Sequence, residues 1–256
     1  MEKKFINDIS AVNYSERVTI DNPKDIEICT RLKKTTNARI CVGRVGDRFK
    51  TETLLKFRAD HAVAMDAVWS YVDEAIVDRL GFFKVQTLIE DKEQYIKRPD
   101  LGRIFSVETL ESIKNNCKNH IDVQIIAADG LSSNAINANL EDIYSIILDG
   151  LKAKGYTIGT PIFVKYGRVA AMDKISEALN AKVTVLLIGE RPGLATGESM
   201  SSYMAYESNS LKPESQRTVV SNIHKNGTPP VEAGAEIVDL IGIMLREKKS
   251  GVDLKM

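Results

Sequence analysis

The amino-acid sequence predicts an α/β fold: a Rossmann-like, mostly parallel sheet with flanking helices, preceded by an N-terminal helical segment. Three observations predict this class. Short runs of branched apolar residues recur between residues 122 and 189, each run ends in a turn that contains glycine, and helical patterns separate the runs. Strands that alternate with helices imply βαβ units, which place the strands parallel with right-handed crossovers.

The first part of the chain has a different pattern from the rest. Residues 1–50 are polar and mixed, which predicts loose structure, and "RICVGRVGDR" at 39–48 predicts a loop. From Thr53, apolar residues recur at i, i+3 and i+4 and predict a helix over 53–80 that ends near Gly81.

A linker is predicted at "KRPDLGR", residues 97–103, from its proline and glycine. We therefore expect two domains. Residues 1–100 form an N-terminal extension with the long helix, and residues 101–256 form the Rossmann-like domain.

The elements of the second domain follow from caps and apolar periodicity. Ser106 is placed as an N-cap with Glu108 in the first turn, which predicts a helix to about Cys117. The remaining predicted elements are strands at 122–130, 161–167 and 182–189, a possible edge strand at 202–208, and helices from Ile136 to Gly155, Met172 to Leu179 and Val231 to Arg246.

The overall charge balance excludes some classes of partner. Lys+Arg and Asp+Glu both number 35, so the net charge is zero and favours neither nucleic acid nor a membrane surface. One local excess exists, with nine Lys and Arg residues from Arg31 to Arg58 against Asp47 and Glu52. Without interleaved aromatic residues, this stretch predicts a solvated face or a surface for an acidic partner.

The cysteines and hydropathy favour the cytoplasm. Cys29, Cys41 and Cys117 form no ligand-spaced pair, which argues against a zinc site or a disulfide scaffold. No apolar run reaches membrane-spanning length, and the N-terminus lacks the apolar core of a signal peptide.

Common catalytic motifs are missing from the sequence. The turn after the first predicted core strand reads "ADGLSSNA", which is not the GxGxxG of dinucleotide-binding folds, and neither a P-loop nor a GxSxG motif occurs. The three histidines, His61, His120 and His224, are scattered. We therefore predict that this chain carries no catalytic residue and no metal site of its own.

Polar turns follow the three predicted core strands. They read "DGLSS" with Asp129, Ser132 and Ser133, "KYGRVAAMD" with Val169, and "GERPGL" with Glu190. Turns that follow neighbouring strands at one edge of a sheet favour a crevice there for a large ligand of mixed polarity. Two alternatives remain. In one, a serine of "DGLSS" only caps the helix that follows it. In the other, "GERPGL" is only a polar turn, closed by glycine, at the end of its strand.

Six motifs together resemble a known family. They are "LGRIFSVETL", "DVQIIAADGLSS", "GRVAAMD", "LLIGERPGL", "RTVVSNIHKNGTPPVEA" and "SGVDLK". In this order they resemble the small subunits of ethanolamine ammonia-lyase, from about residue 43 to the C-terminus. "GERPGL" and "SNIHKNGTPP" are the most specific of them.

The resemblance implies a subunit of an adenosylcobalamin-dependent carbon–nitrogen lyase that converts ethanolamine to acetaldehyde and ammonia by a radical mechanism. It implies a hetero-oligomer in which this chain covers the cobalamin beside a large, catalytic barrel subunit and is inactive alone. The cobalt receives no ligand from this chain. The implied location is cytoplasmic, inside a bacterial microcompartment, with neither nucleic acid nor membrane as a partner.

The resemblance also assigns three cobalamin-binding residues. Val169 is implied as a backbone or apolar contact, and Glu190 as a hydrogen-bond acceptor for a corrin side-chain amide. Val219 stands where relatives often carry cysteine, so a thiol contact is lost there while a backbone contact survives. The DxHxxG motif of base-off cobalamin proteins is missing, which predicts base-on binding.

Two rival functions remain open at this point. One is a self-sufficient Rossmann-like oxidoreductase, against which the missing glycine fingerprint counts. The other is a structural adaptor in which the acidic turn at Glu190 only shapes the scaffold.

Overall fold

A computed structural model describes residues 14 and 16–254 of the chain. Their internal contacts divide them into two compact units. The first unit contains the chain up to Asp66 together with Gly193–Thr196, and the second contains Ala67–Pro192 together with the chain from Gly197 onward. Residues 67–100 thus belong to the same unit as the sheet, whereas the cofactor-binding role of 101–256 stays a prediction.

The first unit contains more regular structure than the sequence predicted. Helix α1 (Ile26–Lys34) begins at Asp25, whose side chain accepts a hydrogen bond from the Ile28 backbone N–H. Strands β1 (Arg44–Val45) and β2 (Arg48–Phe49) form a hairpin that begins within "RICVGRVGDR" and ends one residue after it. The prediction of loose structure was therefore wrong for these segments, and residues 1–13 and 15 lie outside the described part of the chain.

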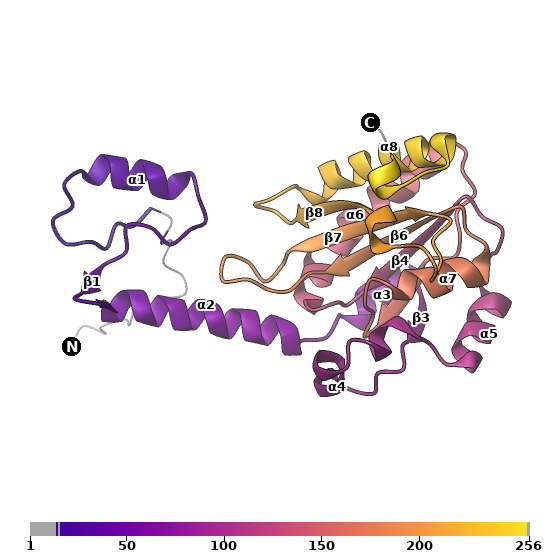
Figure 1. The fold of residues 1–256 in the computed structure, drawn as a ribbon, viewed down its shortest axis with the longest axis horizontal. Coiled ribbons are helices and arrows are strands. Elements are labelled where there is room, and N and C mark those ends of the chain that lie inside the picture. Colours follow the sequence, from indigo (N-terminus) through magenta and orange to yellow (C-terminus); the bar gives the residue numbers. More distant parts are fainter. Residues whose placement is uncertain (1–13, 15, 255–256) are drawn as a thin grey trace. The chain divides into compact units, whose positions relative to one another are not determined.

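The second unit is built on a six-stranded sheet in the order β3-β5-β4-β6-β7-β8, labelled in Figure 1. Four strands are parallel neighbours, and β7 and β8 continue the sheet in antiparallel pairing. The strands are β3 (Phe83–Gln86), β4 (Val123–Ala128), β5 (Ile162–Lys165), β6 (Val183–Gly189), β7 (Met200–Tyr206) and β8 (Thr218–Ile223). This topology confirms the predicted α/β class.

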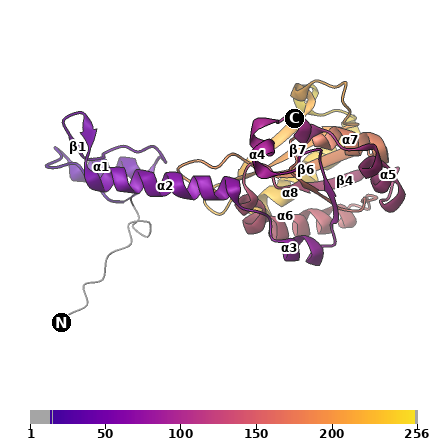
Figure 2. The same cartoon turned by 90° about the horizontal axis from the view of Figure 1, so that it is seen from below.

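Helices cover both faces of this sheet (Figure 1 and Figure 2). One core includes Val123, Ile125 and Ala127 of β4 and packs under α6 (Ser133–Ala153) and α8 (Pro230–Glu247). The other includes Ile126 and Ala128 and packs under α5 (Val107–Asn116) and α7 (Ala171–Leu179). Successive residues of β4 thus enter opposite cores, as the alternation of side chains along a strand requires.

The predicted helix over 53–80 is two helices in the structure. Helix α2 (Thr51–Trp69) ends eleven residues early, and α3 (Glu74–Arg79) begins after Asp73, whose side chain caps it by accepting from the Ala75 N–H. The capping aspartate competes with continued helix and explains the break. The apolar periodicity that joined the two segments does not mark one buried face, since Leu54, Met65 and Trp69 are exposed.

Four further elements correct or extend the sequence prediction. Strand β8 was not predicted. Strand β3 was not predicted, because four residues with alternating exposure leave little apolar signal. Strand β7 was predicted as a possible edge strand but lies between β6 and β8. Helix α4 (Lys92–Lys97) was also not predicted and precedes a 3₁₀ turn at Leu101–Arg103.

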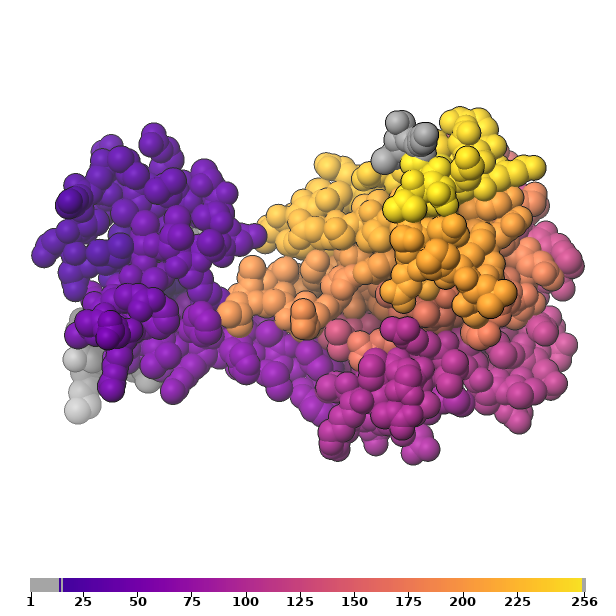
Figure 3. All heavy atoms as spheres, in the orientation of Figure 1, coloured from indigo at the N-terminus to yellow at the C-terminus, as the bar shows by residue number. Residues whose placement is uncertain are grey.

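The surface of the second unit is formed by segments that are distant in the chain. In Figure 3, magenta residues near position 100 lie beside orange residues near position 200. Among the described residues, none of the helices has the length and apolar character needed to cross a membrane.

Candidate functional site

Two of the three sequence-predicted residues line one hollow on the second unit. The hollow has a volume of about 310 Å³, and its wall includes Arg103, Arg168, Val169, Tyr203, Arg217 and Val219. Val169 lies in the loop between β5 and α7, and Val219 lies on β8. Tyr203 of β7 is the register partner of Val219, so the two side chains are neighbours on one sheet face.

The sheet face under this hollow is open at β8. Val219 is 45% exposed, whereas Val220 on the opposite face is 8% exposed and belongs to the core under α8. Val169 and Tyr203 pack against the other core, the one under α5 and α7. An apolar surface is therefore available to a ligand at the hollow, on the side of the sheet that bears α7.

Glu190 is connected to the hollow by a hydrogen bond with Tyr203, which lines it. Its backbone N–H, one residue beyond β6, donates to the Ser199 carbonyl at 2.9 Å. The Tyr203 hydroxyl donates to Glu190 Oε1 at 2.9 Å. Burial and the nearby Glu190 carboxylate raise the pKa of Tyr203 to about 12, so the hydroxyl stays protonated and remains a donor at neutral pH.

Close packing against the turn after β4 explains why residue 189, which precedes Glu190, is a glycine. A Cβ at Gly189 would lie 2.0 Å from the Ser132 carbonyl oxygen and 2.6 Å from that of Asp129, which are backbone atoms of the turn after β4. The Leu131 N–H donates to the Gly189 carbonyl at 2.9 Å. The turns after β4 and β6 therefore interlock, and this fixes the point at which Glu190 leaves the sheet.

The loop that carries Val169 is clamped on several sides. The Gly167 N–H donates to Asp129 Oδ1 at 3.1 Å, and the Tyr95 hydroxyl donates to the Gly167 carbonyl at 2.8 Å. The Arg168 N–H donates to the Gly102 carbonyl at 2.8 Å, and its guanidinium lies 4.1 Å from the centroid of the Tyr95 ring. These contacts restrict the backbone directly before Val169.

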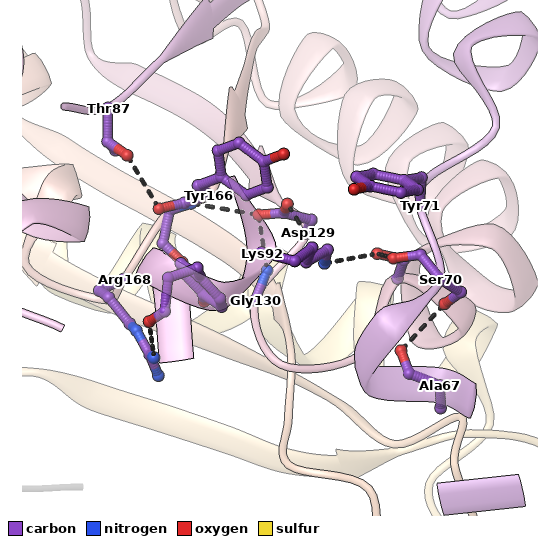
Figure 4. A network of polar contacts seen from close by, with 12 residues as sticks. Ala67, Ser70, Tyr71, Thr87, Lys92, Asp129, Gly130, Tyr166 and Arg168 are labelled. Carbon is purple, nitrogen blue, oxygen red and sulfur yellow. Dashed lines mark hydrogen bonds and ion pairs between the residues drawn. The ribbon is translucent and has the colours of Figure 1, made fainter. Parts of the chain in front are cut away.

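A buried ion pair supports this clamp (Figure 4). Lys92 Nζ lies 3.8 Å from Asp129 Oδ2, and both side chains are at most 3% exposed. Three tyrosine rings, including those of Tyr71 and Tyr166, have centroids 5.4 to 5.9 Å from the same nitrogen. Burial lowers the pKa of Lys92 and raises the pKa of Asp129.

The turn "DGLSS" does not contribute to the hollow, so the predicted crevice of three strand exits was wrong in this part. Ser132 accepts from the Ala135 N–H at 3.2 Å and is the N-cap of α6, which confirms the capping alternative. Ser133 donates to the Ser70 carbonyl at 2.9 Å. Asp129, Ser132 and Ser133 are buried.

A second buried ion pair joins the wall of the hollow to α7. The Arg217 guanidinium is 2.8 Å from Asp173 Oδ2 and 3.4 Å from Glu214 Oε1. Ser208 donates to Asp173 Oδ1 at 2.5 Å. Because Asp173 belongs to α7 and Arg217 precedes β8, this pair fixes the two segments that carry Val169 and Val219.

The arrangement has groups that suit the binding of a ligand. It offers two apolar side chains, a carboxylate acceptor and arginine donors, and Arg168 Nε is buried without a hydrogen-bond partner among the described residues. Sequence reasoning missed Tyr203, Arg103 and Arg217. Only Tyr203 had a signal, as an aromatic residue in the strand predicted at 202–208.

Comparison with known proteins gives a single family. Residues 27–255 match the family described as Ethanolamine ammonia-lyase light chain (EutC). A protein of Clostridium acetobutylicum named "Ethanolamine ammonia-lyase small subunit" is 71% identical over 230 residues, which cover 90% of this chain and 95% of that protein.

Two further relatives carry the same name. The one from Clostridium tetani is 52% identical over 255 residues, which cover 100% of this chain and 86% of that protein. The one from Listeria monocytogenes is 50% identical over 250 residues, which cover 98% of this chain and 85% of that protein.

Proposed function

The chain belongs to the family of ethanolamine ammonia-lyase light chains, the small subunits of this lyase, and we propose that its hollow forms one wall of an adenosylcobalamin site. The large subunit of the lyase supplies the other wall. Val169, Glu190 and Val219 are the residues of this chain that contact the cofactor, and residues 101–256 are its cobalamin-binding domain.

The chemistry of the hollow supports this proposal. A corrin presents an apolar ring face and a rim of carboxamide side chains. Val169 and Val219 suit the ring face, and the Glu190 carboxylate suits an amide N–H donor at the rim. The arginines of the hollow suit amide oxygens, since arginine offers only donors.

The size of the hollow supports a shared site. Closed cavities of about 300–1,000 Å³ enclose drug-sized ligands. A cobalamin with its nucleotide loop is much larger than such ligands, and this hollow measures about 310 Å³. A second protein surface is therefore required to enclose the cofactor, and the large subunit is the partner that the name "small subunit" implies.

The division of labour follows from this assignment. When bound, adenosylcobalamin supplies the radical chemistry of the lyase. This chain orients the corrin through the clamped loop at Val169 and the carboxylate of Glu190, and it shields the cofactor from water. The missing DxHxxG motif supports base-on binding, and the resemblance supports a cytoplasmic location in a microcompartment.

The first unit and α2 offer a surface for the large subunit. In α1 the charged Lys33 is buried, with Nζ donating to the Ile40 carbonyl at 3.2 Å, while Ile28 and Leu32 are exposed. The large apolar residues of α2 that are exposed include Leu54, Leu55, Val63, Met65 and Trp69. Together with the basic excess between Arg31 and Arg58, these side chains suit a partner surface that is acidic and apolar.

The experiment that tests the cofactor site uses Val219. In the complex with the large subunit, Val219→Asp places a charge against the corrin and is expected to weaken cyanocobalamin binding at least tenfold. Val219→Cys keeps the size and should bind within about twofold of the unchanged chain. The matched control is Val231→Asp on α8, where the native valine is 51% exposed and distant from the hollow in the fold.

Equal cyanocobalamin affinity for the unchanged chain and for Val219→Asp would contradict the assignment of the hollow. The melting temperature of each complex shows whether a loss of binding comes from unfolding.

A further inference from the structure

Tyr203 is the side chain through which Glu190 and the hollow are connected. Its ring packs against the core under α5 and α7, and its strand position pairs with Leu186 on β6 and Val219 on β8. Its hydroxyl donates to Glu190 Oε1 at 2.9 Å. The phenol is thus held by a strand in the middle of the sheet, while Glu190 lies just beyond the end of its own strand.

Glu190 needs such a partner to present its carboxylate in one orientation. The hydrogen bond from the Glu190 N–H to Ser199 fixes only the backbone. A glutamate side chain outside a strand retains several rotamers, and ordering it on ligand binding would cost conformational entropy. The contact with Tyr203 restricts the carboxylate in advance, and it leaves Oε2 available as an acceptor.

We propose that Tyr203 is a positioning residue that holds the Glu190 carboxylate toward the corrin amide. This inference rests on the proposed cobalamin site. Tyr203 acts through Glu190 in this arrangement, and it has no second proton to donate to the cofactor, because its single hydroxyl proton is donated to Oε1.

A double-mutant cycle tests this role in the complex with the large subunit, with cyanocobalamin affinity as the measured quantity. Tyr203→Phe removes only the hydroxyl and is expected to weaken binding by roughly five- to tenfold, since a net hydrogen bond contributes about that factor. In the Glu190→Ala background, Tyr203→Phe is expected to change the affinity by less than twofold. Tyr206→Phe is the matched control, because Tyr206 is on the same strand and packs against the opposite core.

The outcomes separate this inference from the proposed site. Unchanged affinity of Tyr203→Phe, with normal binding by the complex of unchanged sequence, overturns the role of Tyr203 alone. An equal loss in both backgrounds also overturns it, because Tyr203 would then act independently of Glu190. Absence of binding by the complex of unchanged sequence overturns the cobalamin site together with this inference. When the loss is equal in both backgrounds, the melting temperature of each complex distinguishes an independent contribution of Tyr203 to binding from a contribution to folding, and either result overturns the positioning role.

Discussion

Replacement of Glu190 by glutamine isolates the charge of the proposed acceptor. The glutamine would keep the size and one oxygen, so the Tyr203 hydroxyl retains its acceptor and the turn after β6 keeps its contacts. A hydrogen bond to a charged group contributes about 1.5–3 kcal/mol, against about 1 kcal/mol for a neutral one. The difference of about 1 kcal/mol predicts a cofactor affinity roughly fivefold weaker for Glu190→Gln.

Replacement by alanine should cost more than replacement by glutamine. Glu190→Ala removes the acceptor of the corrin amide and also the acceptor of the Tyr203 hydroxyl. The unpaired corrin amide costs about 1–3 kcal/mol, so a loss of roughly thirtyfold in affinity is expected, which is about 2 kcal/mol. The Tyr203 hydroxyl loses its acceptor in the free and the bound state alike and does not add to this loss. Folding should change little, because the Glu190 side chain does not belong to either core.

The assay is equilibrium binding of adenosylcobalamin to the reconstituted complex, together with thermal unfolding of the isolated chain. Glu236→Gln on the exposed face of α8 is the control for a loss of charge. For a chain of this size, a destabilisation of about 1 kcal/mol lowers the melting temperature by roughly 2–4 °C. Unchanged affinity of Glu190→Ala with a much larger drop in melting temperature would refute the reasoning and identify Glu190 as a structural turn residue.

Four other predictions concern activity, assembly, stability and pH. The isolated chain should produce no acetaldehyde from ethanolamine, and addition of the large subunit with adenosylcobalamin should restore production; turnover by the chain alone would contradict this division. Met65→Asp on the exposed surface of α2 should reduce co-purification with the large subunit without changing the circular dichroism of the isolated chain, and unchanged co-purification would exclude Met65 from the contact. Asp173→Asn leaves the buried Arg217 without its closest carboxylate and should lower the free energy of unfolding in urea by about 3–5 kcal/mol; a loss below about 1 kcal/mol would show that the pair is not needed for stability. The pKa of Tyr203 rises from 10.0 to about 12 on folding, so its protonated form contributes stability below pH 10 that is lost as the pH rises toward 12. Tyr203→Phe should therefore unfold with a smaller pH dependence in this range than the unchanged chain, and identical profiles would contradict the raised pKa.

Most elements that the sequence predicted correctly have a continuous apolar signal, whereas α5 was predicted from its Ser106 cap. Strands β4 and β6 are buried along their whole length, and α6 carries buried residues at helical spacing over 21 residues. Strand β3 alternates over only four residues and therefore gave no signal that could be distinguished from a loop. The break between α2 and α3 depends on one capping side chain, Asp73, which periodicity does not register.

The candidate site was only partly accessible to sequence reasoning. The resemblance assigned Val169, Glu190 and Val219, and the structure brings the two valines to one hollow and connects Glu190 to it through Tyr203. The register between β7 and β8 places Tyr203 beside Val219. Because β8 was not predicted, this register could not be inferred from the sequence. Buried pairs such as Asp173 with Arg217 join residues 44 positions apart and have no local signature.

Hydrogen exchange of the reconstituted complex, with and without bound cobalamin, tests the cofactor wall most directly. Bound cobalamin should slow exchange of backbone amides at residues 166–171 and 217–220, which include residues of the wall, and at 189–191, which include the proposed acceptor Glu190. The exposed face of α8 should serve as an internal reference with unchanged exchange. Protection in those three segments is the predicted result, and cobalamin-dependent protection that occurs only in the large subunit would contradict the proposed site.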